Sequence, residues 1–402
     1  MQRILIVTPH TLSCGEAITA IHVANHLARH GWQANFLASP NTAKLIPPKF
    51  ETRLLAGDLK ENQVVWVQTV RRLKPKLVLF ADYPLLALQA GSVPLANEAW
   101  IESLELLDAA LLTLDHLDLA HADRLPSLPP PNRMGILLPC PIHNPSRQAG
   151  PKLALFRYWT PPATLDSDRR SALRARYLGC SRGLLVFHAV PRWTQFMATI
   201  MNQPLYNFLP KLLIRYLAGM PDPITVVSVN DGTLLPSLTV NDLTIVNLPN
   251  MPPNEFEETL ACSDLMLSEN CFSVSLGKAV CSLVPAVLWR HTLNPIDVLT
   301  SEDDLVSSVA AEMILHNPKS LNPWLAFPSF DPSLVSAFNS LKDEPAIQCL
   351  EIFGGTSTHR AIRALLTDER EREMFRARQL AYRERVSELP TPLEAIQKLT
   401  GC

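Results

Sequence analysis

The sequence predicts an α/β protein made of two doubly wound, mostly parallel sheets. Three observations support this class. The 402 residues are 47% hydrophobic, which is enough to bury two large cores. Short apolar runs typical of buried strands alternate with segments of helical apolar spacing, as crossovers between parallel strands require. The alternation begins again after a proline-rich zone between Pro126 and Pro162.

The first half opens with the apolar run 3–8, RILIVT, which we expect to be a strand buried on both faces. Apolar residues then recur at helical spacing over 16–31, where Gly31 is a natural stop. The run 32–39 is the next expected strand. The further elements expected here are strands at 52–57, 77–83 and 109–115 and a helix at 64–75.

The second half repeats this pattern. The elements expected there are helices at 167–179, 205–219, 255–264 and 274–283, and strands at 183–189, 224–230, 243–248, 265–268 and 285–289. The charged segment 366–386 predicts a long helix with an exposed face. The proline-rich zone predicts a linker or domain edge. We therefore expect domains at 1–155 and 156–375 and a closing helix within 376–402.

The bulk properties exclude several classes of function. A net charge of −2 gives no electrostatic basis for binding nucleic acid. No uncharged apolar run reaches the roughly 18 residues of a membrane span, although the apolar segment 205–219, with Lys211 and Arg215, suits either peripheral membrane contact or packing on its own sheet. The N-terminus lacks a secretory layout, and the eight cysteines form no CxxC pair. We expect a cytoplasmic protein with neither a cofactor nor a metal.

A polar stretch follows one buried run in the second half. Residues 268–275, SENCFSVS, lie between the expected strand 265–268 and the helix after it. Ligands of open parallel sheets bind beyond the carboxyl ends of the strands, and a helix N-terminus there attracts phosphate. The stretch therefore indicates a diphosphate site, while the alternative is that Ser273 or Ser275 simply caps the helix.

Residues 248–289 resemble the donor-binding stretch of GT-B glycosyltransferases, with a strand, a polar loop, a helix of small residues and a proline-led strand. The nearest families are the lipid-linked N-acetylglucosaminyltransferase of peptidoglycan synthesis and the protein-arginine rhamnosyltransferase of elongation factor P. Segments 15–39, 166–189 and 358–386 resemble the first helix, the entry to the second domain and the closing helices. The resemblance implies two Rossmann-like domains facing a cleft, a last helix that crosses back to the first domain, and no metal.

The same resemblance implies a set of donor-binding residues. Those near the polar stretch are Glu269, Asn270, Ser273 and Ser275. The sequence departs from the pattern in two places. Lys278 stands where the peptidoglycan-type enzymes carry a ribose-binding glutamate, and HAVPRW replaces a glycine-rich loop. In that loop Arg192 could neutralise a diphosphate and Trp193 could stack on a base, or they could be a surface arginine and a core tryptophan.

The first loop resembles the acceptor side of these enzymes. The peptidoglycan-type family has a histidine at the mouth of the first helix, and the matching position here is Glu16, after Gly15. The arginine-rhamnosylating family uses acidic residues in this region, so the resemblance implies Glu16 as the base that takes the acceptor proton. The alternative is a capping box in which Ser13 is the cap and Glu16 its third position. His10 and His22 are lesser candidates.

Two more strand ends carry polar side chains. Asp82 and Tyr83 follow one strand, and Asp115 and His116 follow another. A carboxylate beside an imidazole at this edge can do acid–base work or orient an acceptor, or each residue can simply bond to the backbone of its loop. Three histidines recur at every fourth position, which indicates a partly exposed helix stripe rather than metal ligands: His22, His26 and His30.

These features predict a glycosyltransferase that moves a sugar from a nucleotide sugar to an acceptor in the interdomain cleft. The acceptor is a small molecule, a lipid-linked glycan or a protein side chain. Two alternatives stay open. One is a nucleotide-sugar 2-epimerase or hydrolase of the same fold. The other is a catalytically inactive partner protein, favoured by Lys278 and the glycine-poor loop.

Overall fold

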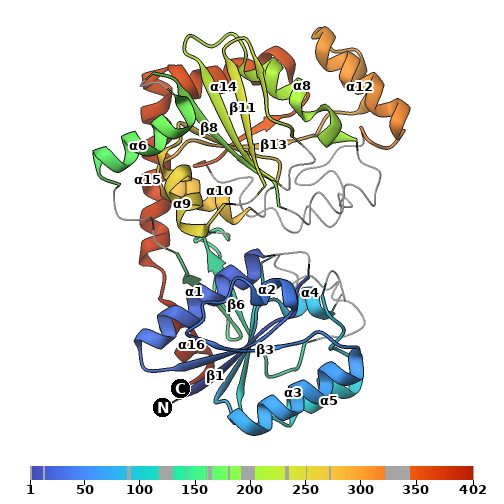
Figure 1. The fold of residues 1–402 in the computed structure, drawn as a ribbon, viewed down its shortest axis with the longest axis vertical. Coiled ribbons are helices and arrows are strands. Elements are labelled where there is room, and N and C mark those ends of the chain that lie inside the picture. The colour runs from blue at the N-terminus through green and yellow to red at the C-terminus, as the bar shows by residue number, and fades with distance from the viewer. Residues whose placement is uncertain are drawn as a thin grey trace. The chain divides into compact units, whose positions relative to one another are not determined.

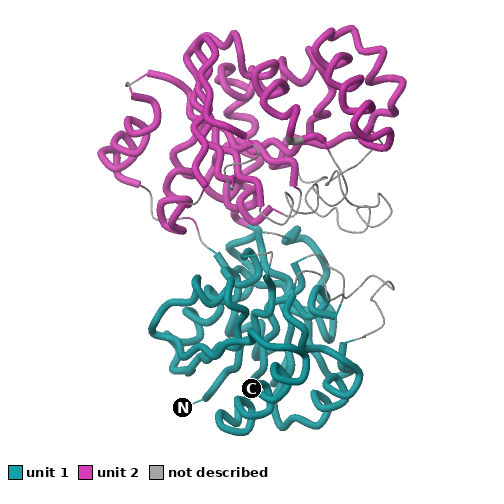
Figure 2. The backbone as a smooth tube through the Cα atoms, turned by 45° about the vertical axis from the view of Figure 1, so that its right-hand side comes forward, with its two compact units in different colours: residues 1–159, 385–402 teal, residues 160–384 magenta. Residues whose placement is uncertain are grey.

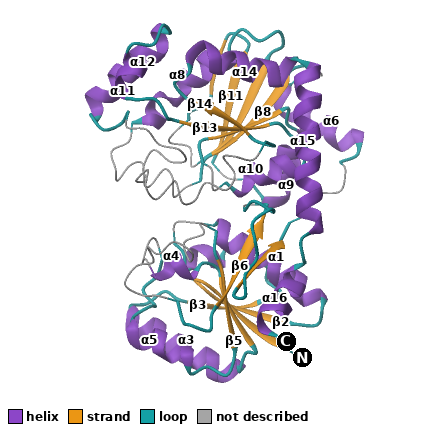
Figure 3. Cartoon of the chain, turned by 180° about the vertical axis from the view of Figure 1, so that it is seen from behind, coloured by secondary structure: helices purple, strands orange, loops and turns teal. Residues whose placement is uncertain are grey.

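The chain forms two compact units in a computed structural model. Unit 1 contains residues 1–159 and 385–402, and unit 2 contains residues 160–384 (Figure 2). The structure describes residues 2–11, 14–87, 92–116, 130–141, 143–159, 161, 165–179, 182–191, 204–230, 235–249, 251–270, 273–321 and 345–401. Each unit has a central sheet flanked by helices (Figure 3).

Unit 1 contains a seven-stranded sheet in the order β3-β2-β1-β4-β5-β6-β7, with every described pair parallel. Its strands are β1 (Arg3–Thr8), β2 (Gln33–Ala38), β3 (Glu51–Leu54), β4 (Leu77–Phe80), β5 (Ala110–Leu114), β6 (Gly135–Cys140) and β7 (Leu153–Arg157). The order reverses between β1 and β4. A parallel sheet of this kind opens a crevice for ligands at the carboxyl ends of those two strands.

The helices of unit 1 begin and end where their capping chemistry places them. They are α1 (Gly15–Arg29), α2 (Pro40–Ala43), α3 (Leu59–Leu73), α4 (Tyr83–Ala87), α5 (Glu98–Glu105) and α16 (Pro392–Thr400). Asp58 and Glu61 form a capping box at the start of α3. Figure 1 shows α3 beside α5, and their Trp66 and Trp100 pack in one core with strand residues such as Phe80.

The proline-rich zone 126–162, where a linker or domain edge was expected, contains the division between the units after Trp159. It also contains β6 and β7, which belong to the first sheet. Pro139 lies inside β6. Pairing with β5 ends at Leu137, so the missing N–H of Pro139 interrupts no bond to that neighbour. A proline-rich sequence therefore contains two strands here, one of which directs its end toward the polar residues described below.

Unit 2 contains a second seven-stranded sheet in the order β10-β11-β9-β8-β12-β13-β14. Its strands are β8 (Leu184–Ala189), β9 (Ile224–Val229), β10 (Leu238–Val240), β11 (Leu243–Leu248), β12 (Leu265–Ser268), β13 (Ala286–Arg290) and β14 (Gln348–Glu351). β10 pairs antiparallel with β11, and the other described pairs are parallel. The order reverses between β8 and β12, which defines a second switch point.

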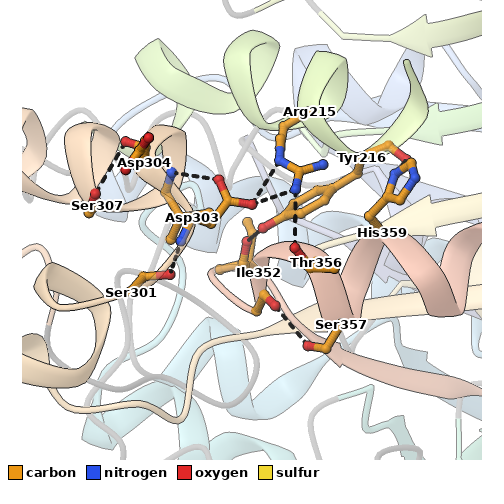
Figure 4. Close-up of polar contacts among 12 residues, drawn as sticks. Arg215, Tyr216, Ser301, Asp303, Asp304, Ser307, Ile352, Thr356, Ser357 and His359 are labelled. Carbon is orange, nitrogen blue, oxygen red and sulfur yellow. Dashed lines mark hydrogen bonds and ion pairs between the residues drawn. The ribbon is translucent and has the colours of Figure 1, made fainter. Parts of the chain in front are cut away.

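The helices of unit 2 cover both faces of this sheet. They are α6 (Ser167–Leu178), α8 (Leu205–Leu217), α9 (Pro253–Cys262), α10 (Val274–Cys281), α11 (Pro295–Leu299), α12 (Asp304–His316), α14 (Gly355–Thr367) and α15 (Glu369–Glu388). A buried apolar cluster unites α8, α12 and α14 with the strands. Figure 4 shows polar contacts across these helices, in which Arg215 of α8 pairs with Asp303 at 2.6 Å and bonds to Thr356 of α14.

The expected long helix at 366–386 is interrupted. α14 ends at Thr367, and Asp368 accepts hydrogen bonds from the backbone N–H groups of Arg370 and Glu371 at the start of α15. After α15 the chain returns to unit 1, where α16 packs against β6, β7 and α1. The C-terminal helix thus covers part of the first sheet, as the resemblance to GT-B enzymes predicts.

Candidate functional site

Polar side chains gather at the carboxyl ends of the unit 1 strands, on both sides of the switch point. His10 follows β1, Asp82 follows β4, and Asp115 and His116 follow β5. His143 follows β6, and Glu16 lies in the first turn of α1. None of the six exceeds 7% exposure. Buried polar groups in such number require partners, so their mutual contacts determine what this cluster can do.

Asp82 and His116 form the central pair of the cluster. Oδ2 of Asp82 lies 3.5 Å from Nδ1 of His116 and also accepts the backbone N–H of His116 at 3.2 Å. Oδ1 accepts the N–H of Leu85 at 2.9 Å, so both oxygens face donors. On its other side, Nε2 of His116 lies 3.0 Å from Oγ1 of Thr19, on α1. The pair thus connects the end of β4 to the first helix.

Two other histidines of the cluster lie in surroundings that keep them neutral. Burial lowers the pKa of His10 below its usual value, against the opposing charges of Glu16 and Asp82. Its Nε2 has no hydrogen-bond partner among the described residues. Burial lowers the pKa of His143 to about 4, although its Nε2 bonds to the carbonyl oxygen of Asp115 at 2.7 Å. An imidazole that is neutral at pH 7 can accept a proton.

The start of α1 differs from the expected capping box. The N-cap residue is Cys14, in an αR conformation and without a side-chain cap bond, and Gly15 is the first helical residue. Ser13, the expected cap, lies outside the described residues. Glu16 is 7% exposed, and its charge acts on both His10 and His116. The carboxylate therefore belongs to the acid–base cluster by position.

Unit 2 carries a buried hydrogen-bonded chain at its own switch point. Oε2 of Glu269 lies 3.2 Å from Nε2 of His188, and Nδ1 of His188 lies 3.0 Å from Oγ of Ser228. Asn230 donates through Nδ2 to Ser228 Oγ at 2.9 Å. Because that oxygen accepts from Asn230, its own proton is available for Nδ1, and Nε2 then donates to the carboxylate. All four side chains are at most 3% exposed.

The polar stretch after β12 supplies both a cap and backbone turns. Ser273 is the N-cap of α10 and accepts the N–H of Leu276, as the capping alternative predicts. Asn270 is buried and donates its backbone N–H to Ser268 Oγ, and Ser275 lies half-buried in the first turn of α10. Two donor-site predictions, Arg192 and Trp193, lie outside the described residues.

Lys278 lies in α10, where the resemblance would place a ribose-binding glutamate. The residue is 5% exposed and its Nζ pairs with Oε1 of Glu257, on α9, at 2.5 Å. Burial lowers the pKa of Lys278, against the raising effect of the Glu257 charge. The pair neutralises itself between two helices. It provides neither a free carboxylate nor a free ammonium group of the kind an exposed side chain would offer.

Across the part of the chain that the structure describes, the side chains that usually bind metal ions do not gather into one site. Within the described ranges no group of three or more His, Cys, Asp or Glu side chains could hold a metal ion. His22 and His26 are half-buried on α1, and His30 is exposed at its end. Among the described cysteines, Cys140, Cys262 and Cys281 are buried. Among the described helices, none combines the length and apolar character of a membrane span.

Sequence reasoning named Glu16, Asp82, Asp115 and His116, which lie in the polar cluster of unit 1, and Glu269, which lies in that of unit 2, but it missed part of their surroundings. The residues it missed are Thr19, His143, His188, Ser228 and Asn230, and His10 was only a lesser candidate. His188 and Ser228 are each the penultimate residue of their strand, at the same sheet edge as Glu269. Polar residues at the last positions of otherwise apolar strands were the signal that could have identified them.

Comparisons with known proteins agree with this architecture. The model of the "Family of unknown function (DUF6365)" matches residues 23–401. No curated protein matches the chain. Among solved structures, the spinosyn rhamnosyltransferase SpnG complexed with spinosyn aglycone is similar with a TM-score of 0.57 at 13% identity, covering 99% of this chain and 100% of that one.

Two other structures show the same likeness. The glycosyltransferase VinC in complex with DTDP has a TM-score of 0.56 at 12% identity, with 100% of this chain and 99% of that one covered. MurG of Acinetobacter baumannii has a TM-score of 0.50 at 13% identity, with coverage of 100% and 98%. The chain therefore belongs to the family of unknown function that matches residues 23–401, and its two doubly wound sheets have the GT-B fold.

Proposed function

We propose that the chain is a glycosyltransferase that moves a sugar from a nucleotide sugar to an acceptor, without a metal ion. The observation that carries this proposal is the pair of buried polar clusters, one at the switch point of each sheet. Such switch points are where open α/β sheets bind ligands. Two similar structures are the glycosyltransferase VinC in complex with DTDP and the spinosyn rhamnosyltransferase SpnG complexed with thymidine diphosphate, which supports a nucleotide-sugar donor here.

Unit 2 would hold the donor. Its switch point presents the N-terminus of α10, where Ser273 donates its backbone N–H to the carbonyl oxygen of Asn270, the residue after Glu269. A helix N-terminus favours a diphosphate, and a buried carboxylate beside it is suited to bind sugar hydroxyl groups. The expected contributions of Ser275, Arg192 and Trp193 remain part of the proposal.

Unit 1 would hold the acceptor and supply the general base. In an inverting transfer the base removes the acceptor proton while the acceptor oxygen or nitrogen attacks the anomeric carbon. The bond from that carbon to the diphosphate then breaks, and the nucleoside diphosphate leaves. Glu16 is 7% exposed and His10 is 1% exposed, so Glu16 is the group that an acceptor reaches more readily. We therefore assign the base to Glu16, with Asp82 and Asp115 as groups that orient the acceptor.

The substitution Glu16→Gln tests the base. We expect turnover to fall by about 10²- to 10⁴-fold, because a general base contributes on that order, while nucleotide binding stays unchanged. The matched control is Glu98→Gln, which changes an exposed glutamate in the first turn of α5. His10→Gln distinguishes the lesser candidate. Full turnover in Glu16→Gln together with its loss in His10→Gln would move the base to His10.

The reaction class is tested with a panel of nucleotide sugars. Thermal-shift and calorimetric titrations with thymidine and uridine diphosphates identify which nucleobase unit 2 prefers in its donor. Incubation without an acceptor then separates transfer from the alternatives. Release of free nucleotide at the full turnover rate would favour a hydrolase or 2-epimerase. Absence of binding by every nucleotide and nucleotide sugar in the panel would support an inactive partner protein.

A further inference from the structure

The ring of His116 has an oxygen atom near each nitrogen. Its Nδ1 lies 3.5 Å from Oδ2 of Asp82, an ion-pair distance at which the two atoms form no hydrogen bond, and its Nε2 lies 3.0 Å from Oγ1 of Thr19. His116 is 5% exposed and Asp82 is fully buried, so solvent does not screen this contact. The two distances raise the question of how many protons the ring carries.

The hydrogen bonds of the Thr19 hydroxyl determine whether Nε2 of His116 carries a proton. Oγ1 of Thr19 donates to the carbonyl oxygen of Gly15 at 3.0 Å, one turn earlier in α1. A threonine hydroxyl has a single proton, so with that proton on Gly15 the oxygen can only accept from His116. Nε2 therefore carries a proton. A neutral ring would then direct the lone pair of Nδ1 at the Asp82 carboxylate, which is repulsive.

The surroundings of the ring are predominantly negative. Glu16 of α1, Asp82 after β4 and Asp115 after β5 all attract a positive charge on His116. The other imidazoles near it, His10 and His143, belong to the ends of β1 and β6, and burial lowers the pKa of each. Arg147 is a further cation near this cluster, because its charge interacts with that of Asp115. Positive charge on His116 thus balances a surplus of carboxylates.

We propose that His116 is held as an imidazolium and acts as the positioning residue of the unit 1 site, rather than as a base. Its Nε2–H donates to Thr19 and its positive charge pairs with Asp82, so the ring links α1 to the end of β4 beside Glu16. Because Glu16 is the proposed base, this role in turnover rests on the proposed function. The protonation state itself does not.

The direction of titration agrees with this geometry. Burial by itself would lower the pKa of His116. The contact with Asp82 and the charges of Glu16 and Asp115 outweigh burial and raise that pKa above its usual value of 6.5. His116 is the one histidine of the cluster whose described surroundings shift the pKa upward, which separates it from His10 and His143.

Nitrogen NMR of the full chain with labelled histidine tests the proton count. The signals of His116 are assigned by their loss in His116→Gln. We expect both ring nitrogens to carry protons at pH 7 and the ring to lose one only at higher pH. A singly protonated ring at pH 7, with its proton on Nδ1 and with Nε2 accepting from Thr19, would overturn the proposal.

The substitution Thr19→Val tests the hydrogen-bond direction without changing the shape of the site. Removal of an acceptor for Nε2–H destabilises the cation, so the titration midpoint of His116 should fall by about one pH unit, a tenfold change in proton affinity. If Thr19 instead donated to Nε2, the midpoint would stay or rise. Thr367→Val is the matched control, because that exposed threonine makes the same bond to a carbonyl four residues earlier and has no hydrogen bond to a histidine among the described residues.

The effect on turnover separates positioning from a merely structural role. The charge on His116 is lost only as the pH rises through its own raised pKa, so the turnover of the parent chain should fall on the alkaline side of the pH–rate profile, and that alkaline limb should be absent in His116→Gln. A uniform loss of activity at every pH would overturn the positioning role. A doubly protonated ring in a chain that binds no nucleotide would contradict the proposed function and leave the assignment of the proton intact.

Discussion

At the scale of single residues, the buried imidazoles of this chain have separate roles that their partners impose. His116 bonds to a hydroxyl and pairs with a carboxylate, His188 bonds to a carboxylate and a hydroxyl, and His143 donates to one carbonyl. A histidine ring has two nitrogens whose protonation follows these partners. Each ring can therefore be tested by substitutions that replace one nitrogen at a time.

The pair His188→Gln and His188→Asn tests the chain that reaches Glu269. A glutamine amide extends to about the position of Nε2 and can still donate to Glu269, whereas asparagine reaches only the position of Nδ1. We expect Asn to weaken nucleotide binding by about tenfold, because a buried carboxylate that loses a donor costs on the order of 1–3 kcal/mol. Gln should stay within about threefold of the parent affinity. Equal affinities in calorimetry would remove His188 from the donor site.

His143 predicts how stability depends on pH. The pKa of this ring is about 4 in the folded chain and about 6.5 when unfolded, so between these values only the unfolded chain binds the proton. Stability contributed by the neutral ring is complete above pH 6.5 and is lost as the pH falls toward 4, by roughly 3 kcal/mol in total.

Urea unfolding between pH 7 and 4 measures this contribution. His143→Gln retains an N–H donor for the carbonyl of Asp115 but cannot titrate. Its unfolding free energy should therefore decline less steeply with falling pH than that of the parent chain. Parallel curves for the two proteins would mean that His143 is already protonated in the folded state or exchanges its partner.

At the scale of elements, local patterns predicted the strands that are apolar throughout. The strand Arg3–Thr8 has the expected bounds, and the helix Ser167–Leu178 ends at Gly179, whose positive φ suits a helix terminus. β6 and β7 escaped prediction because prolines obscured them. The sequence does not show that Pro139 lies beyond the residues that pair with β5. Without β6, the position of His143 could not be inferred.

The candidate site followed from the same reasoning, with the same limit. Asp82, Asp115 and Glu269 directly follow apolar runs, and a parallel sheet brings such positions to one edge. Thr19 and His188 lie inside regular elements, where polar residues usually serve the element itself. Their roles depend on which strands are neighbours, as β8 is to β9 and β12, and sequence order alone does not give that neighbourhood.

At the scale of the whole molecule, the fold of unit 1 depends on the far end of the chain. α16 packs on β6, β7 and α1, and its Ile396 is 1% exposed. Thr391 and Glu394 form a capping box that fixes the start of this helix. The last residues therefore complete a core that the first residues begin, and the polar cluster at the strand ends of unit 1 rests on that core.

The substitution Ile396→Ala tests this dependence. Removing buried methyl groups from a packed core costs about 2–5 kcal/mol, so we expect unit 1 to unfold at a lower temperature in calorimetry. Because α16 belongs to unit 1, the transition of unit 2 should keep its temperature. Lys398→Ala, which changes an exposed residue of the same helix, is the control and should leave both transitions in place. If Ile396→Ala left unit 1 as stable as the parent, α16 would not contribute to the stability of unit 1, and the acid–base cluster would not depend on this helix.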